Sequence, residues 1–190
     1  MQGRESTMPP IEQWESYFDA TAIIAALAGA GVHGDVVEFG CGYGTFTIPM
    51  ARRTSGTVYA LDIDPLMVSA TTGRAEHAAL SNVVVEQRDF VAHGSGRTTG
   101  SVELALLFNI LHIEEPVALL NEVHRVLVPS GRIGITHWIH DERTPRGPSL
   151  EIRPRAAQCR AWAEEAGFEV AWHGDLPGSP WHWGMVVERH

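Results

Sequence analysis

Three glycines separated by single residues, with a carboxylate before them, are the part of this sequence best suited to ligand chemistry. Gly40, Gly42 and Gly44 follow the apolar run of residues 35–39. They would let the chain turn tightly and a ligand approach its backbone, and a helix opening there could hold an anion. The dinucleotide-binding fingerprint needs its third small residue one place later, where this chain has threonine. Glu38 favours a cationic or hydroxyl-rich ligand over a pyrophosphate.

The elements that would position this turn are short apolar runs alternating with helical segments, which predicts a parallel sheet of βα units. The expected strands are residues 35–39, 57–61, 83–86, 102–108, 132–138, 168–173 and 183–188. Pro116 predicts the start of one helix, and Arg153-Pro154 predicts the start of another that ends at Gly167. Residues 141–152 would form a long loop after the fifth strand, where α/β folds bind ligands.

Size and charge exclude several classes of function. A chain of 190 residues is long enough for one domain with a sizeable core. The net charge of -9, with fourteen Arg and no Lys, argues against nucleic-acid and anionic-membrane partners and removes Schiff-base chemistry. Two widely spaced cysteines, no signal peptide and no membrane-spanning run predict a cytoplasmic protein.

Several segments resemble motifs of one enzyme superfamily. The glycine segment, residues 36–45, resembles motif I of the class I S-adenosylmethionine-dependent methyltransferases, which reads acid-x-Gly-x-Gly-x-Gly. The further segments that resemble motifs of that superfamily, in its order, are Tyr59 to Asp64, Arg88 to Phe90, Leu107 to His112 and Leu127 to Gly134. The resemblance covers residues 35–138, about half of the chain.

This resemblance implies a fold and a domain layout. The fold would be a Rossmann-like, doubly wound, seven-stranded and mostly parallel sheet, with helices on both faces and the last strand antiparallel. The chain would be a single methyltransferase domain in three parts. These parts would be an N-terminal helical segment or lid (1–33), a cofactor-binding core (34–140), and an acceptor-side loop, helix and last two strands (141–190).

The resemblance also implies a cofactor, S-adenosylmethionine, which leaves as S-adenosylhomocysteine. Asp62 would hold both ribose hydroxyls, Asp89 would accept from the adenine amine, and the Phe90 N–H would face the ring. The expected cofactor-binding residues are Glu38, Gly40, Cys41, Gly42, Gly44, Asp62, Ile63, Asp89, Phe90 and Asn109. Asp64 is the better N-cap for a helix with Pro65 at its first position, which leaves Asp62 for the ligand. Asn109 could instead cap the following turn.

An acceptor that loses a proton would also need a general base. His112, His137 and His140 are the candidates, because they should lie near strand ends and histidine titrates near neutrality. His137 and His140 also invite a metal-site interpretation. Residues three apart in a strand face opposite ways, so we expect no metal. Cys41 lies beside a helix start, which could lower its pKa.

The acceptor is expected to be a small molecule. Trp14, Tyr17 and Phe18 fall on one helical face, and they would pack the N-terminal segment and help close a lid, with Trp14 and Tyr17 touching the acceptor. Four arginines cluster around the long loop, namely Arg143, Arg146, Arg153 and Arg155. They suggest an anionic acceptor, because arginine binds carboxylate or phosphate bidentately, and Arg143 and Arg146 are the expected acceptor-binding residues.

Two other functions compete with methyl transfer. A non-catalytic protein could use the same fold to sense S-adenosylmethionine, and an NAD-dependent oxidoreductase could use a related glycine turn. The glycine spacing counts against the oxidoreductase. Either a monomer or a homodimer is compatible with the sequence, and tryptophans near the C-terminus would suit an interface.

Overall fold

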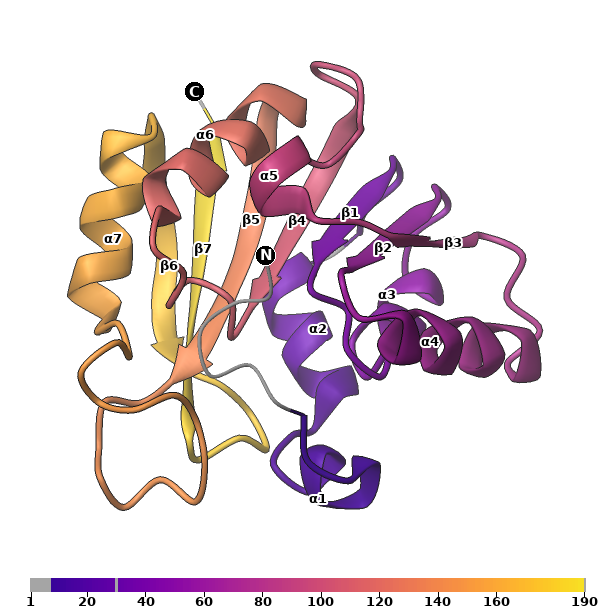
Figure 1. Ribbon diagram of the computed structural model, residues 1–190. Coiled ribbons are helices and arrows are strands. Elements are labelled where there is room, and N and C mark those ends of the chain that lie inside the picture. The colour runs from indigo at the N-terminus through magenta and orange to yellow at the C-terminus, as the bar shows by residue number, and fades with distance from the viewer. Residues whose placement is uncertain (1–7, 30, 190) are drawn as a thin grey trace.

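A seven-stranded sheet forms the centre of the computed structural model, which describes residues 8–29 and 31–189 (Figure 1). The strand order is β3-β2-β1-β4-β5-β7-β6. The strands are β1 (Val36–Phe39), β2 (Val58–Asp62), β3 (Val83–Gln87), β4 (Val102–Phe108), β5 (Leu127–Trp138), β6 (Phe168–Asp175) and β7 (His182–Arg189). Six strands run in the same direction, and β7 runs antiparallel to both of its neighbours, β5 and β6. The predicted fold class is confirmed.

The predicted strands agree with the structure except at the start of β5. Continuous pairing with β4 begins at Arg132, as predicted, but the strand itself begins at Leu127. Ser130 has a left-handed backbone (φ 63°), and the register shifts in this part of the β4–β5 pair. Pro129, Ser130 and Gly131 therefore form an irregularity inside β5.

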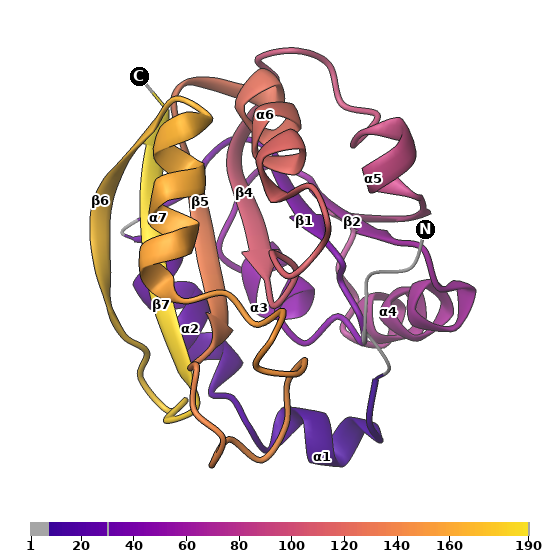
Figure 2. The ribbon, with the colours of Figure 1, turned by 60° about the vertical axis from the view of Figure 1, so that its left-hand side comes forward.

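Helices cover both faces of the sheet (Figure 2). They are α1 (Ile11–Glu15), α2 (Ala20–Ala28), α3 (Thr47–Ala51), α4 (Pro65–His77), α5 (Phe90–His93), α6 (Pro116–Val126) and α7 (Ala156–Glu165). The Asp64 side chain accepts the Leu66 N–H and caps α4, with Pro65 as the first helical residue. This confirms the predicted cap.

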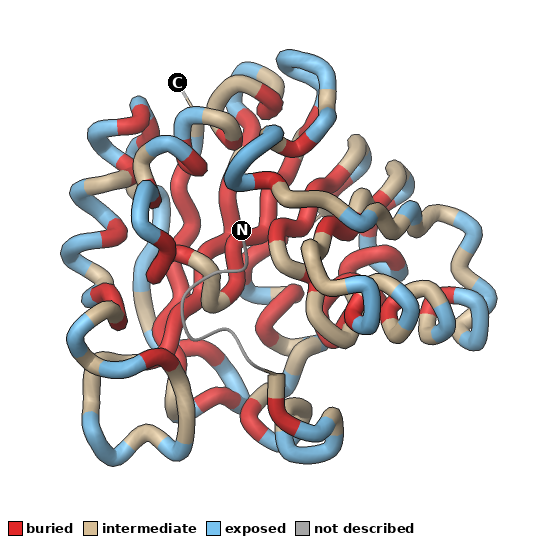
Figure 3. The backbone as a smooth tube through the Cα atoms, in the orientation of Figure 1, coloured by how far each residue is buried: buried red, intermediate tan, exposed pale blue. Residues whose placement is uncertain are grey.

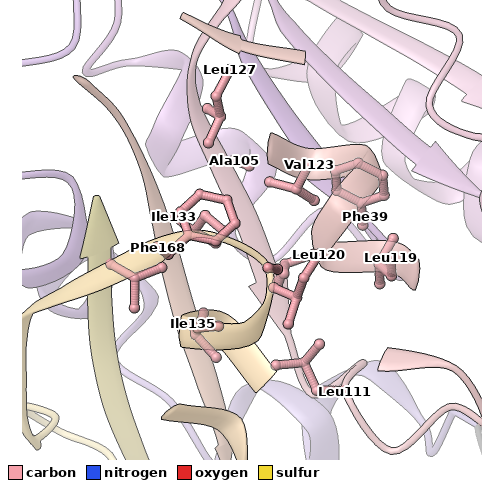
Figure 4. Packing of buried hydrophobic residues seen from close by; sticks show 14 of the residues in the cluster. Phe39, Ala105, Leu111, Leu119, Leu120, Val123, Leu127, Ile133, Ile135 and Phe168 are labelled. Carbon is pink, nitrogen blue, oxygen red and sulfur yellow. The ribbon is translucent and has the colours of Figure 1, made fainter. Parts of the chain in front are cut away.

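Two hydrophobic cores lie on opposite faces of the sheet, because successive residues of a strand point to opposite sides. Ala105 and Leu107 of β4 pack in the cluster that contains α6 and α7 (Figure 4). Leu104 and Leu106 pack in the other cluster, with α2 and α3. Because helices cover both faces, the central strands are buried, while the outer sides of the helices are exposed (Figure 3).

The N-terminal segment differs from the expected single helical face. Helix α1 ends at Glu15, and Asp19 caps α2 by accepting the Ala22 N–H. Tyr17 and Phe18 lie in the break between these helices, so the three aromatic side chains do not share one helix. They still pack as a cluster, because the Trp14 and Phe18 ring centroids are 4.8 Å apart. Residues 1–7 and 30 of the expected N-terminal segment lie outside the described residues.

Helix α7 begins at Ala156, later than the predicted Arg153. The delay has a local cause, because Arg155 has an extended backbone and its N–H bonds to the side chain of Gln158. Within residues 8–29 and 31–189, none of the helices has the length and apolar character needed to cross a membrane.

Candidate active site

A cleft with about 910 Å³ of empty space, including its open mouth, lies at the carboxyl ends of β1 to β4. We call it the first cleft. Its lining is mostly apolar and comes from the segments that follow these strands, from α4 and α5, and from the N-terminal segment. The lining residues are Met8, Trp14, Gly40, Cys41, Gly42, Phe46, Asp62, Ile63, Asp64, Met67, Arg88, Asp89, Phe90, Val91, Phe108, Asn109, Ile110 and Ile113.

The glycine turn forms the floor of the first cleft. All three glycines have positive φ, between 53° and 77°, which side chains rarely permit. A Cβ on Gly42 would lie 3.2 Å from the Met8 side chain, whereas one on Gly44 would lie 2.9 Å from Thr71. Gly40 and Gly42 therefore keep the cleft open, and Gly44 permits close packing of the turn against α4 without lining the cleft.

Asp62 reaches the first cleft from the end of β2. Its two carboxylate oxygens accept the N–H groups of Gly42 (2.9 Å) and Asp64 (3.0 Å), which ties the glycine turn to β2. Burial raises the pKa of Asp62, although these backbone bonds oppose the shift. Carboxylate oxygens accept more than one hydrogen bond each, so Asp62 keeps capacity for ligand hydroxyls.

Asp89 and Phe90 lie together after β3. The Asp89 side chain caps α5 by accepting the Ala92 N–H, and the Phe90 ring packs edge-on to Phe39 at 5.3 Å. Arg88 also lines this end of the cleft, but its guanidinium donates to the carbonyls of His93 and Gly94. The charged lining of the cleft is predominantly acidic.

Glu38, in contrast, does not line the first cleft. It is 1% exposed and accepts a hydrogen bond from the Thr47 hydroxyl on α3. Burial, with the nearby Asp62 charge adding to it, raises the pKa of Glu38 to about 8. Glu38 is therefore mainly uncharged at neutral pH and lies beneath the glycine turn.

We expect Glu38 to make stability depend on pH. Its pKa is higher in the folded chain than in the unfolded one, so the folded state binds more protons between pH 4.5 and about 8, and stability falls as the pH rises through that window. Glu38→Gln keeps an acceptor for Thr47 without a charge. Its advantage over wild type should grow by about 2–4 kcal/mol between pH 5 and 8. Urea unfolding at several pH values gives the free energy of unfolding of both proteins. A difference between wild type and Glu38→Gln that stays constant from pH 5 to 8 would contradict the prediction.

Cys41 lines the first cleft, as expected, but the pKa of its thiol is raised, whereas a position beside a helix start was expected to lower it. Burial, and then the charges of Glu38 and Asp62, raise the pKa of its thiol. Its sulfur lies near the Thr71 hydroxyl and the Gly42 carbonyl. Cys41 is thus a packed thiol and is not activated as a nucleophile.

A second cleft, with about 1000 Å³ of empty space, adjoins the first at Ile113, which lines both. It lies between the segment after β4, the loop after β5 and the start of α7. We call it the second cleft, and its lining residues are Leu111, His112, Ile113, Glu114, Pro116, His140, Leu150, Glu151, Ile152, Arg153, Pro154, Arg155, Gln158 and Trp162.

The three candidate histidines occupy different environments. His137 is wholly buried, and burial lowers its pKa well below the usual value. His112 lines the second cleft, with its Nδ1 3.3 Å from His137 Nε2. His140 also lines this cleft, and its Nδ1 lies 2.9 Å from the Arg153 carbonyl, which can only accept. The neutral His140 ring therefore carries its proton on Nδ1 and has a lone pair on Nε2.

The expected acceptor residues are not brought to one place. Trp14 lines the first cleft, but Tyr17 is buried and packs edge-on to Trp138 at 5.3 Å. Arg143 pairs with Asp141 and is largely exposed, and neither it nor Arg146 lines either cleft.

Arg153 was expected only as one of the four arginines around the long loop, and the structure gives it a more specific role in the second cleft. Its buried guanidinium donates to the carbonyls of Ile139, Asp141 and Pro148 and holds the loop between β5 and α7. Other unassigned lining residues, such as Phe46, Met67 and Phe108, look like ordinary core positions in the sequence. Within the described ranges, no three His, Cys, Asp or Glu side chains lie where they could hold a metal ion.

Comparison with known proteins places this geometry in a family. The sequence profile of the methyltransferase domain family matches residues 36–131, half of the chain. Nocamycin O-methyltransferase of Saccharothrix syringae is 34% identical over 109 residues, covering 54% of this chain and 37% of that protein. Sterol 24-C-methyltransferase erg-4 of Neurospora crassa is 22% identical, covering 92% and 52%. The chain thus spans about a third to a half of the length of these curated relatives.

A solved structure of similar size shares the fold over nearly its full length. The S-adenosylmethionine-dependent methyltransferase from Aquifex aeolicus superposes with a TM-score of 0.81, at 22% identity, covering 92% of both chains. The family match spans the glycine turn and the strands β1 to β4, whose ends line the first cleft. This chain therefore belongs to the methyltransferase domain family, and it shares the fold of that S-adenosylmethionine-dependent enzyme.

Proposed function

We propose that this protein transfers the methyl group of S-adenosylmethionine to a small-molecule acceptor, with the cofactor in the first cleft and the acceptor in the second. The observation that carries the proposal is the convergence of the glycine turn, Asp62 and Asp89 on one mostly apolar cleft. When bound, the cofactor supplies a methyl group activated on a sulfonium centre. The protein supplies binding, alignment and protection from water.

The residues of the first cleft fit this cofactor. Gly40 and Gly42 leave open the space that side chains would fill, and Asp62 offers acceptors for ribose hydroxyls. Asp89 and the Phe90 backbone would hold the adenine, with Ile63 beside it. Acidic residues suit the positive charges of the cofactor. Of the remaining expected residues, Cys41 and Asn109 line the first cleft, whereas Glu38 and Gly44 do not line it and would support the glycine turn.

An NAD-dependent reaction has less support from the same residues. The helix that follows the glycine turn, α3, has only five residues and begins three positions after Gly44, so it offers little dipole to a pyrophosphate. The Gly42 N–H already donates to the Asp62 carboxylate at 2.9 Å, so this donor of the turn is not available to a pyrophosphate, and the other acids of the lining add negative charge. The site thus favours a cationic ligand.

His140 is our candidate general base for an acceptor that loses a proton. It lines the second cleft, and its bond to the Arg153 carbonyl orients the ring with the lone pair on Nε2. The proton of the acceptor would move to this nitrogen. His112 is the alternative in the same cleft, whereas the burial of His137 removes it from contact with any acceptor.

The charge of the acceptor is a separate part of the proposal. An anionic acceptor would rely on Arg155 at the start of α7, because Arg143 and Arg146 lie outside the lining. Glu114 and Glu151 face the same cleft and oppose an anion. Trp162 adds an aromatic surface. These groups favour a small amphipathic acceptor. The second cleft is lined by a single chain, so either a monomer or a homodimer could bind this acceptor.

Calorimetric titration tests the proposed cofactor. We expect S-adenosylmethionine and S-adenosylhomocysteine to bind with micromolar dissociation constants, about −8 kcal/mol, and NAD not to bind. Binding of NAD without the sulfonium cofactor would overturn the proposal. Release of S-adenosylhomocysteine in the presence of a panel of small hydroxyl, amine and thiol acceptors separates an enzyme from a sensor, because a sensor would bind the cofactor without turnover.

A further inference from the structure

A directed chain of hydrogen bonds begins at the wall of the first cleft. The Trp138 N–H donates to Asn109 Oδ1 (3.1 Å), which fixes the orientation of the Asn109 amide. The Nδ2 of Asn109 then lies 3.4 Å from His182 Nε2. An amide nitrogen can only donate, so Nε2 must accept, and the neutral His182 ring carries its proton on Nδ1.

The same chain continues into the N-terminal segment. His182 Nδ1 lies 2.9 Å from the Ser179 hydroxyl oxygen, which accepts a hydrogen bond from the Nδ1–H group. The Ser179 hydroxyl in turn donates to the Tyr17 carbonyl (3.1 Å). Each group has one consistent role, and the chain links the break between α1 and α2 to the ends of β4, β5 and β7.

Aromatic packing holds His182 in this position. Its ring centroid lies 4.6 Å from that of Phe18 and 4.0 Å from that of Trp138, and the residue is 2% exposed. The charges nearest to it come from other elements, chiefly the Arg153 guanidinium, while His137 is a buried neighbour. Burial, together with Arg153, lowers the pKa of His182 to about 3, so the ring stays neutral at ordinary pH.

Asn109 is the residue through which this chain reaches the cofactor site. It lines the first cleft and has a left-handed backbone with φ of 57°, which is unfavourable for a side chain although asparagine tolerates it best. Both polar atoms of its side chain bond to the sheet, and its N–H donates to the Thr136 carbonyl (2.8 Å). These bonds set the shape of the cleft wall.

We infer that His182 is a positioning residue for cofactor binding. It holds Asn109 in the wall of the first cleft and, through Ser179, ties the N-terminal segment that carries Trp14 to the same wall. This inference rests on the proposed function, because it assumes that the cofactor occupies the first cleft. Its structural part, the direction of the hydrogen-bond chain, can be tested without any ligand.

Nitrogen-15 NMR of the imidazole rings tests the direction of the chain. We expect His182 in the wild-type protein to be neutral with its proton on Nδ1, and not to titrate between pH 5 and 8. A proton on Nε2, or titration within that range, would overturn the inference.

Binding of S-adenosylhomocysteine to variants tests the positioning role. His182→Phe keeps the aromatic packing without the nitrogens, and we expect it to raise the dissociation constant about tenfold. Ser179→Ala should raise it by a smaller factor. Thr54→Val is the matched control, because Thr54 also makes two hydrogen bonds through a buried hydroxyl but lies at the opposite end of β1.

The outcomes separate this inference from the proposed function. A purely structural His182 would lower the stability of His182→Phe while leaving the affinity of the folded protein unchanged, which would overturn the positioning role alone. Failure of the wild type to bind S-adenosylhomocysteine would overturn both. Equal loss of affinity in Thr54→Val and His182→Phe would also overturn the positioning role of His182, because a general loss of stability would then explain the weaker binding.

Discussion

Replacing His140 with asparagine is expected to lower kcat about a hundredfold for an acceptor that loses a proton on methylation, because general bases contribute effects of this size. The asparagine amide keeps a donor for the Arg153 carbonyl, which lies 2.9 Å from Nδ1 in the wild type, but it has no basic nitrogen. The affinity for S-adenosylmethionine should not change, since His140 lines only the second cleft. Initial rates of S-adenosylhomocysteine formation measure the effect.

His112→Asn is the matched comparison, because both histidines line the second cleft. A large loss of kcat in His112→Asn, with His140→Asn near wild type, would transfer the role of base to His112. Wild-type rates in both variants would show that neither histidine takes the proton, and the assignment of a base would then be wrong.

Asp62→Ala is expected to weaken the binding of S-adenosylmethionine and S-adenosylhomocysteine by about 1–3 kcal/mol, which is roughly fivefold to 150-fold in dissociation constant. Two contributions add in the same direction. The variant loses charged acceptors for ribose hydroxyls, and the Gly42 N–H loses the carboxylate oxygen that holds the glycine turn at 2.9 Å. Isothermal titration calorimetry measures the change.

Asp35→Ala controls for loss of a structural carboxylate. Asp35 accepts the Thr57 N–H at 2.8 Å, but it lies at the opposite end of β1 from the glycine turn. Its removal should cost stability and leave cofactor affinity within about twofold of wild type. If Asp62→Ala binds the cofactor as tightly as Asp35→Ala does, then Asp62 is not part of the binding site.

Much of the fold follows from local patterns in the sequence. The strands are short apolar runs bounded by glycine, proline or acids. Strand β4 is apolar except for Glu103, as expected for a strand covered on both faces. The carboxyl ends of parallel strands meet at one edge of a sheet, so the clustering of Asp62 and Asp89 could be predicted without coordinates. Each carries a local signal, namely its place directly after a strand.

Other features depend on contacts between distant residues, which local patterns do not encode. Glu38 belongs to the same motif as the glycines, yet its burial against Thr47 follows from how α3 packs. The His182–Asn109 contact joins residues 73 positions apart. Arg153 was predicted only as a helix start and as one of the arginines around the loop, because its carbonyl partners come together only after the loop folds.

A crystal structure of the protein with S-adenosylhomocysteine is the most direct test of the account. We predict the adenosyl group in the first cleft, with both ribose hydroxyls within about 3 Å of the Asp62 carboxylate and the adenine amine beside Asp89. Density for the nucleoside elsewhere, or in the first cleft with neither carboxylate in hydrogen-bonding reach, would contradict the assignment.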